Sequence, residues 1–406
     1  MKQLTDAERR LIEPIDEAAM LARTERWCAI NSGTGNLQGL ARQASELAVA
    51  FAALPGEVEL REPGPVSSVD AAGNEGEVEH GRHLVLRVRP EAARRFLLTG
   101  HMDTVYPVDH PFQQARWLDA DRLNGPGAAD MKGGLAVMLA ALKAFEASGP
   151  AAGYDVLINA DEETGSLSSA PLIAELAAGK VAALTYEPAA RPEGTLAHAR
   201  GGSGNYSLVV VGRSAHAGRN PQDGRNAIVA AAALAISLKG MEHGELTVNP
   251  ARIEGGSANN VVPDLAVLRF NIRPRNASAA EIFEVDLARL LDIVERGHEV
   301  SIAVHGGITR PPKPVDAQAQ ALFDLVQRSG ADLGQAIGWC ASGGVCDGNN
   351  IAACGVPVVD TMGVRGGEIH SPKEYLIASS LTERAALSAL VLHRLAAEGL
   401  PKGVSA

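Results

Sequence analysis

The first half of the chain alternates short apolar runs with a longer segment of small and aliphatic residues. The apolar runs predict buried strands at 96–100, 155–160 and 181–186. The segment 133–147 opens with two glycines and predicts a helix. This order is typical of a largely parallel sheet with helices on both faces. Functional residues gather at the carboxyl ends of strands in such sheets, so we expect the chemistry directly after these runs.

The pattern changes near residue 200, where Gly201–Gly204 predicts a hinge or linker. Beyond it, the pattern predicts strands at 206–212, 265–273 and 299–305. Helices are predicted between them, at 224–239 and at about 278–295. These elements form a compact α+β unit. From Pro311 the α/β character returns, and a helix is predicted at 379–398. We therefore expect one main domain, interrupted by a smaller inserted one.

Charge and hydropathy exclude several classes of function. The 406 residues include 37 Lys and Arg against 48 Asp and Glu, a formal net charge of −11. Because the chain has no block of basic residues, we expect no binding to nucleic acid or to an anionic membrane surface. The longest apolar run, 227–238, is shorter than the roughly 20 residues that span a bilayer. The N-terminus has no apolar signal-peptide core, so we expect a soluble cytoplasmic protein.

Acidic residues follow each of the three predicted strands, and a histidine also follows the first. HMDTV (101–105) follows the first, ADEETGS (160–166) the second, and Tyr186-Glu187-Pro188 the third. Each has an ordinary explanation on its own, such as a loop histidine or an acidic helix start favoured by the macrodipole. However, the three consecutive acids at 161–163 repel one another unless a cation or a shared proton compensates. A metal ligand beside a general base would explain why the chain tolerates this repulsion.

Two glycine-rich loops carry further candidates. NGPGAADMKGG (124–134) surrounds Asp130 with glycines that allow a tight turn, and GVRGGEIHSPKEY (363–375) presents His370. The alternative for the first loop is a plain turn before a helix. A phosphate-binding loop is disfavoured, because GxxxxGK[ST] is absent and Lys132 precedes its glycines. A Rossmann-type nucleotide enzyme is disfavoured as well, because no GxGxxG follows a strand with an acid at the right distance.

Together these clusters supply two histidines and several carboxylates, a ligand set that suits zinc, manganese or cobalt. Thiolate ligands are not required, and the cysteines form no CxxC pair: Cys28, Cys340, Cys346 and Cys354. A carboxylate shared between two ions would hold them roughly 3.5–4 Å apart with a water between them. A metal-activated water and a nearby glutamate base are the equipment of a hydrolase.

The motifs, in this order and together with GRSAHAG (212–218) and NVVPD (260–264), resemble one family of di-zinc amidohydrolases and exopeptidases. That family includes glutamate carboxypeptidase, aminoacylase, acetylornithine deacetylase and succinyl-diaminopimelate desuccinylase. The resemblance runs from about residue 90 to 390. It implies a catalytic domain of residues 1–199 and 310–406, with a mixed, largely parallel sheet flanked by helices. Residues 200–309 would be an inserted α+β lid and dimerisation domain.

The resemblance also implies the metal ligands, position by position. His101 and Glu187 match the ligands of one ion, Glu163 and His370 match those of the other, and Asp130 matches the bridging carboxylate. Two divalent ions per chain are implied, zinc first, with cobalt or manganese as alternatives.

The resemblance further implies which residues act on the water and on the ligands. Glu162 matches the general base and acid, and Asp103 matches the carboxylate that orients His101. The family often has an acidic residue after the bridging aspartate, with a cis peptide bond between them. Here Met131 follows, and the sequence leaves open whether the 130–131 bond is cis.

Four further residues match substrate-binding positions or suit them chemically. In dimeric members of the family, the histidine that matches His216 reaches the partner's active site and stabilises the oxyanion; the alternative is a surface turn. Asn259 resembles a lid residue that contacts substrate. Arg273 and Arg310 are candidates for binding a substrate carboxylate, because a guanidinium binds carboxylate bidentately. Surface ion pairing explains both arginines equally well.

The implied reaction is hydrolysis of the amide bond of a small N-acyl amino acid or a short peptide that bears a carboxylate. A glutamate-carboxypeptidase-like enzyme is preferred over a deacylase of the acetylornithine deacetylase or desuccinylase type. A rival from another class is a noncatalytic metal-binding relative, and the presence of Glu162 with a complete ligand set argues against it. We also expect a homodimer through the inserted domain, whose Ala-rich helix offers a close-packing face.

Overall fold

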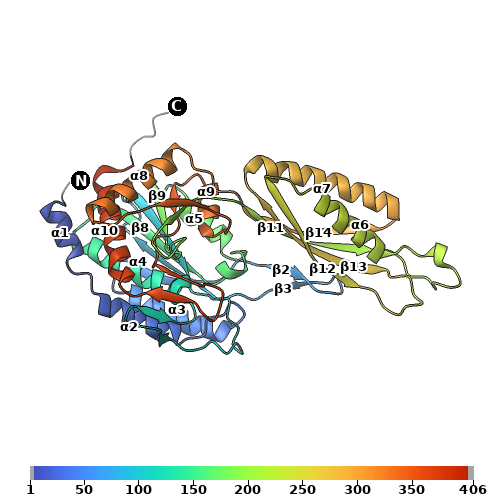
Figure 1. Ribbon diagram of the computed structural model, residues 1–406, viewed down its shortest axis with the longest axis horizontal. Helices are drawn as coiled ribbons and strands as arrows, with labels where there is room; N and C mark the ends of the chain where they lie inside the picture. The colour runs from blue at the N-terminus through green and yellow to red at the C-terminus, as the bar shows by residue number, and fades with distance from the viewer. Residues whose placement is uncertain (1–3, 401–406) are drawn as a thin grey trace. The chain divides into compact units, whose positions relative to one another are not determined.

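The computed structural model describes residues 4–400, which form two compact units (Figure 1). The first unit contains the residues up to Gly64, Glu79–Ala199 and the residues from Pro314 onward. The second contains Pro65–Val78 and Arg200–Lys313. The inserted segment thus extends a few residues beyond the expected 200–309, and residues 65–78 join it. The outermost residues of the expected domain ranges, 1–3 and 401–406, lie outside the described residues.

A six-stranded sheet in the order β1-β4-β8-β5-β9-β16 is the centre of the first unit. Its strands are β1 (Glu57–Arg61), β4 (His83–Val88), β5 (Arg95–His101), β8 (Gly153–Asn159), β9 (Ala182–Thr185) and β16 (Val358–Val359). Strands β8, β5, β9 and β16 are parallel, whereas β4 is antiparallel to both of its neighbours. This confirms the predicted mixed, largely parallel sheet.

Alternate residues of these strands face opposite sides of the sheet, as the pleat of a strand requires. In β5, Phe96 and Leu98 belong to the large core on one side, and Leu97 belongs to a smaller core on the other. Because helices cover both faces, the strands read as continuous apolar runs. The helices of this unit are α1 (Asp6–Ile12), α2 (Glu17–Cys28), α3 (Leu37–Phe51), α4 (Gly133–Ala147), α5 (Ala170–Ala177), α8 (Ala317–Asp332), α9 (Asp347–Ala353) and α10 (Ser380–Glu398).

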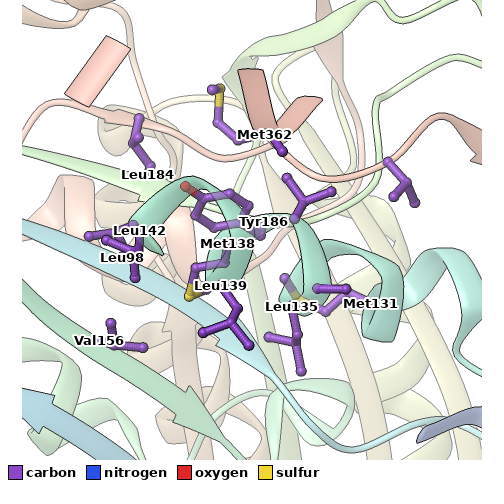
Figure 2. Close-up of a cluster of buried hydrophobic side chains, with 14 of the residues drawn as sticks. Leu98, Met131, Leu135, Met138, Leu139, Leu142, Val156, Leu184, Tyr186 and Met362 are labelled. Carbon is purple, nitrogen blue, oxygen red and sulfur yellow. The ribbon is translucent and has the colours of Figure 1, made fainter. Parts of the chain in front are cut away.

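Helix α4 has the bounds that the sequence predicts, and it is buried along most of its length. Figure 2 shows its side chains packed among residues of the sheet, including Leu98, Val156 and Leu184. Each fully buried Leu or Met contributes about 1.5–3 kcal/mol of hydrophobic stabilisation. Gly134 allows a close approach, because a Cβ there would lie 2.1 Å from the carbonyl oxygen of Tyr186. The start of α4 is therefore held beside the end of β9.

Two smaller sheets complete the first unit. They have the strand orders β17-β18-β7-β6 and β10-β15. The strands are β6 (Arg116–Trp117), β7 (Arg122–Asn124), β10 (Leu196–Arg200), β15 (Trp339–Ser342), β17 (Gly366–Gly367) and β18 (Tyr375–Ile377). Pairing of β18 with β7 brings the loop that contains His370 beside the loop that contains Asp130.

The second unit is a four-stranded antiparallel sheet in the order β12-β13-β11-β14, with two helices on one face (Figure 1). Leu208 and Leu268 pack in the core shared with these helices, whereas Val209 and Val267 contact Val69. Val69 belongs to the β2-β3 hairpin, and this contact explains why residues 65–78 join the second unit. Its elements are β2 (Ser67–Val69), β3 (Glu75–Glu77), β11 (Ser203–Val211), α6 (Ala227–Gly240), β12 (Leu246–Gly255), β13 (Leu265–Pro274), α7 (Ala277–His298) and β14 (Ser301–Arg310).

Within residues 4–400, no helix has both the length and the apolar character needed to cross a membrane. The longest apolar run of the sequence lies in α6, where its buried residues pack against the sheet of the second unit.

Candidate metal centre

The five residues predicted as metal ligands come together in the first unit. His101 is the last residue of β5, Glu163 lies in the turn Glu162–Thr164 that follows β8, and Glu187 follows β9. Asp130 lies in the turn Ala128–Lys132 that leads into α4, and His370 lies between β17 and β18. The carboxyl ends of three neighbouring parallel strands therefore provide three of the five, and two loops provide the others.

These side chains form two groups that share Asp130. In each group, one ligand atom per residue lies within 4.8 Å of the others: His101, Asp130 and Glu187 in one, and Asp130, Glu163 and His370 in the other. In the first group, His101 Nε2 is 3.0 Å from Asp130 Oδ1 and 3.8 Å from Glu187 Oε2. In the second, His370 Nε2 is 3.3 Å from Asp130 Oδ2 and 3.2 Å from Glu163 Oε2. Asp130 thus presents one oxygen to each group.

The charges of the cluster fit a divalent cation. Burial and the nearby charge of Asp130 raise the pKa of Glu163 to about 7. Hydrogen bonds to Asp130 and Glu163 raise the pKa of His370 to about 11. Burial acts to lower the pKa of His101, but the Glu187 charge and hydrogen bonds to carboxylates raise it well above its ordinary value. The carboxylates therefore favour a positive charge between them. A bound metal ion would supply that charge, and it would displace the protons from the imidazole nitrogens that face it.

The turn that presents Asp130 depends on glycine. Gly127 has a φ of 72°, a left-handed conformation that glycine adopts at no steric cost. A Cβ at this position would also lie 2.8 Å from the Thr104 side chain. The Asp130–Met131 peptide bond is cis, which answers the question that the sequence leaves open. Met131 is buried, and its sulfur accepts a hydrogen bond from the backbone N–H of His101 at 3.2 Å.

Asp103 lies beside His101, and both its carbonyl oxygen and its carboxylate face the imidazole. His101 Nδ1 is 3.0 Å from the carbonyl oxygen of Asp103 and 3.4 Å from its Oδ1. Because a carbonyl oxygen only accepts, Nδ1 carries a proton and Nε2 faces the other ligands. The Asp103 carboxylate accepts hydrogen bonds from the backbone N–H of Glu162 at 3.2 Å and of Glu163 at 3.1 Å, and from the Thr34 hydroxyl at 2.7 Å. It therefore fixes the turn that carries both glutamates.

The three consecutive acids at 161–163 have different surroundings. Asp161 is fully buried and accepts hydrogen bonds from Ser168 N–H at 2.7 Å, Ser168 Oγ at 2.8 Å and Ser169 N–H at 3.2 Å. Glu163 faces His370, and Glu162 is half-buried at the start of the turn. Sequence reasoning missed the supporting roles of Asp161 and Thr34. Asp161 could have been found, because it belongs to the run of three acids. Nothing in the local sequence marks Thr34.

The four predicted substrate-binding residues lie in the second unit. His216 and Asn259 are exposed, and His216 Nδ1 accepts a hydrogen bond from Gly218 N–H at 3.1 Å. Arg273 is exposed on β13, and its Nε donates to the Asn271 side chain at 2.9 Å. Arg310 is 2% exposed at the end of β14, a position that does not suit surface ion pairing.

The chain is similar to known proteins over most of its length. The sequence model of peptidase family M20/M25/M40 matches residues 97–394. Carboxypeptidase G2 from Pseudomonas sp. (strain RS-16) is 28% identical over 393 residues, which cover 94% of this chain and 90% of that protein. A succinyl-diaminopimelate desuccinylase from Pseudomonas syringae pv. syringae is 32% identical over 64% of this chain and 70% of its own. A tripeptidase crystal structure from Staphylococcus aureus has the same fold, with a TM-score of 0.73 at 24% identity, covering 95% of this chain and 100% of that chain.

Proposed function

This chain belongs to peptidase family M20/M25/M40 and is a metal-dependent hydrolase, and on that basis we propose that it acts as a glutamate-carboxypeptidase-like enzyme. Its substrate would be a small N-acyl amino acid or a short peptide that bears a carboxylate. The observation that carries the proposal is the pair of ligand groups that share Asp130. The likeness to carboxypeptidase G2 over 94% of the chain supports the carboxypeptidase-like activity.

The ligand groups would hold two divalent ions, zinc first and cobalt or manganese as alternatives. His101, Asp130 and Glu187 would bind one, and Asp130, Glu163 and His370 the other. When bound, ions of this kind polarise the scissile carbonyl and lower the pKa of the attacking water.

Glu162 would move the proton in the reaction. Its carboxylate accepts a proton from the attacking water and then donates it to the nitrogen of the leaving amine. The hydrogen bond from Glu162 N–H to Asp103 fixes the backbone that carries this base. Asp103 also contacts His101 through its carbonyl oxygen, so one residue sets the positions of a base and a ligand. Because these groups are already in position in the folded protein, they need not reorder during the reaction.

The second unit would bind the substrate and stabilise the oxyanion. His216, exposed in its turn, would reach the active site of a partner subunit and donate to the oxyanion. Asn259 would contact substrate from the same unit. Arg273 and Arg310 are proposed to bind the substrate carboxylate, because a guanidinium offers two parallel donors.

A homodimer through the second unit is part of the proposal. Large aliphatic side chains are exposed on its two helices, Val229 and Ile236 on α6 and Ile282, Val285 and Ile293 on α7. A second copy of the chain would cover such apolar side chains. Sedimentation equilibrium tests this point, and a mass of one chain at micromolar concentration would contradict it.

N-acyl amino acid deacylation is the second candidate, favoured by the 32% identity to a desuccinylase. The test compares kcat/KM for peptides with C-terminal glutamate, N-acetylornithine and N-succinyl-diaminopimelate, with zinc present. The proposal predicts the highest value for a glutamyl peptide. A higher value for either acylated amine would favour the deacylase, and metal binding without hydrolysis of any substrate would favour the noncatalytic relative.

A further inference from the structure

Glu374 is a buried carboxylate just after His370 in the chain, and it lies outside both ligand groups. Its side chain is 1% exposed. Oε1 accepts hydrogen bonds from the backbone N–H of Ala129 at 2.9 Å and of Asp130 at 3.1 Å. Oε2 accepts from Gly127 N–H at 3.2 Å and from the Tyr106 hydroxyl at 2.9 Å. Both oxygens are therefore engaged with donors.

These contacts join three segments that carry metal ligands. Tyr106 lies in the loop that follows His101, and the three backbone donors belong to the turn that presents Asp130. Glu374 itself ends the loop that presents His370. A side chain adds a further link, because Asn124 Nδ2, just before the Asp130 turn, donates to the Glu374 carbonyl oxygen at 2.6 Å.

We propose that Glu374 is a positioning residue that holds the ligand loops of His101, Asp130 and His370 in their metal-binding arrangement. It acts on Asp130 directly, through the N–H of that residue, without contacting the metal. Four donors converge on this one carboxyl group, and hydrogen bonds in a buried site are stronger than in water. Without this acceptor, three backbone N–H groups would lose their partner, and the turn would favour other conformations. The inference rests on the proposed metal centre.

The test is zinc affinity, measured by competition with a chromophoric chelator, in the full-length protein. Glu374→Gln keeps the size of the side chain but turns an N–H₂ group toward N–H donors. We expect zinc affinity to fall about 10–100-fold, the usual effect of losing a group that orients metal ligands. We also expect a changed visible absorption spectrum of the Co²⁺-loaded protein, because the ligand geometry changes. Glu368→Gln is the matched control, since it makes the same change at an exposed position of the same loop.

Wild-type zinc affinity and an unchanged Co²⁺ spectrum in folded Glu374→Gln would overturn the inference. If far-UV circular dichroism shows that this variant is unfolded, Tyr106→Phe replaces it, because it removes a single donor to Glu374. A several-fold loss of zinc affinity in Tyr106→Phe would support the inference, and unchanged affinity would overturn it. If the wild-type protein itself binds no zinc, the proposed metal centre is wrong and the inference falls with it.

Discussion

Asp130 and His370 lie far apart in the sequence, yet Oδ2 of Asp130 is 3.3 Å from Nε2 of His370. The other oxygen of Asp130 is 3.0 Å from Nε2 of His101. One carboxylate thus links both ligand groups, whereas Glu187 belongs to only one of them. The two acids should therefore differ in how much metal binding depends on them.

Replacing Asp130 should affect both ions, and replacing Glu187 should affect one. We expect Asp130→Asn to lose nearly all tightly bound zinc, because each group loses its shared anionic ligand. We expect Glu187→Gln to keep about one zinc ion per chain, since the second group is intact. Elemental analysis after dialysis measures both. Two tightly bound ions in Asp130→Asn would contradict the bridging role.

Glu162→Gln should separate catalysis from metal binding. The amide cannot accept the proton of the attacking water, so we expect kcat to fall by about 10²–10⁴-fold while zinc content stays at the wild-type level. Steady-state kinetics and elemental analysis provide the two readouts. The matched control is Glu368→Gln, which should leave both unchanged. Near-wild-type turnover in Glu162→Gln would remove this residue from the role of base.

Mixed dimers can test whether His216 acts on the partner's site. Co-expression of His216→Ala and Glu162→Gln chains with different affinity tags gives dimers that contain one of each. If His216 acts across the dimer, one site of each mixed dimer has both residues intact. Purified mixed dimers should then recover about half of the wild-type activity per dimer, although each parent is nearly inactive. Mixed dimers no more active than their parents would exclude the trans role.

The Glu8–Arg394 contact should make stability depend on pH. Glu8 Oε1 accepts from Arg394 Nε at 2.8 Å, and Oε2 accepts from Thr5 N–H at 2.7 Å. Burial acts to raise the pKa of Glu8, but these hydrogen bonds lower it below its ordinary value of 4.5. A lowered folded-state pKa means that the contact stabilises the protein above pH 4.5 and is lost as the pH falls through the folded-state value.

We therefore expect Glu8→Gln to lower the free energy of unfolding by about 1–3 kcal/mol at pH 7. The difference from wild type should shrink toward pH 3.5. Urea unfolding of both proteins across this range is the measurement, with the exposed Glu13→Gln as control. A difference that stays constant with pH would show that the charge of Glu8 contributes nothing.

The buried elements of the first unit could be predicted because their signals are local. The bounds predicted for α4 agree with the structure, and β5 and β8 lie within two residues of prediction. Two glycines mark the start of α4, and uninterrupted apolar runs mark strands covered on both faces. In the second unit, the predicted hinge Gly201–Gly204 overlaps β11, which begins at Ser203.

Other elements could not be predicted, because their sequences show little of the pattern typical of strands. Strand β12 was not predicted, because it is an edge strand that contains a proline and several exposed polar residues. Its formation depends on pairing with β13. The β2-β3 hairpin is mostly exposed, and the contact of Val69 with Val209 and Val267 shows only in the folded unit.

The residues of the candidate site also differ in how clearly the local sequence marks them. His101 and Glu187 could be found because a polar residue directly after an apolar strand is visible in the sequence. The partners of the Asp103 carboxylate could not, because Thr34 and Glu162 reach it from distant segments. Glu374 was missed for the same reason, since its partners lie up to 268 positions away.

Hydrolysis by this protein should depend on metal held by the two ligand groups that share Asp130. The most direct test counts zinc per chain by elemental analysis and measures hydrolysis of a C-terminal glutamyl peptide before and after chelation. We expect about two zinc ions per chain, loss of hydrolysis when they are removed, and recovery when zinc or cobalt is restored. Hydrolysis that survives complete removal of metal, or a protein that binds none after reconstitution, would contradict it.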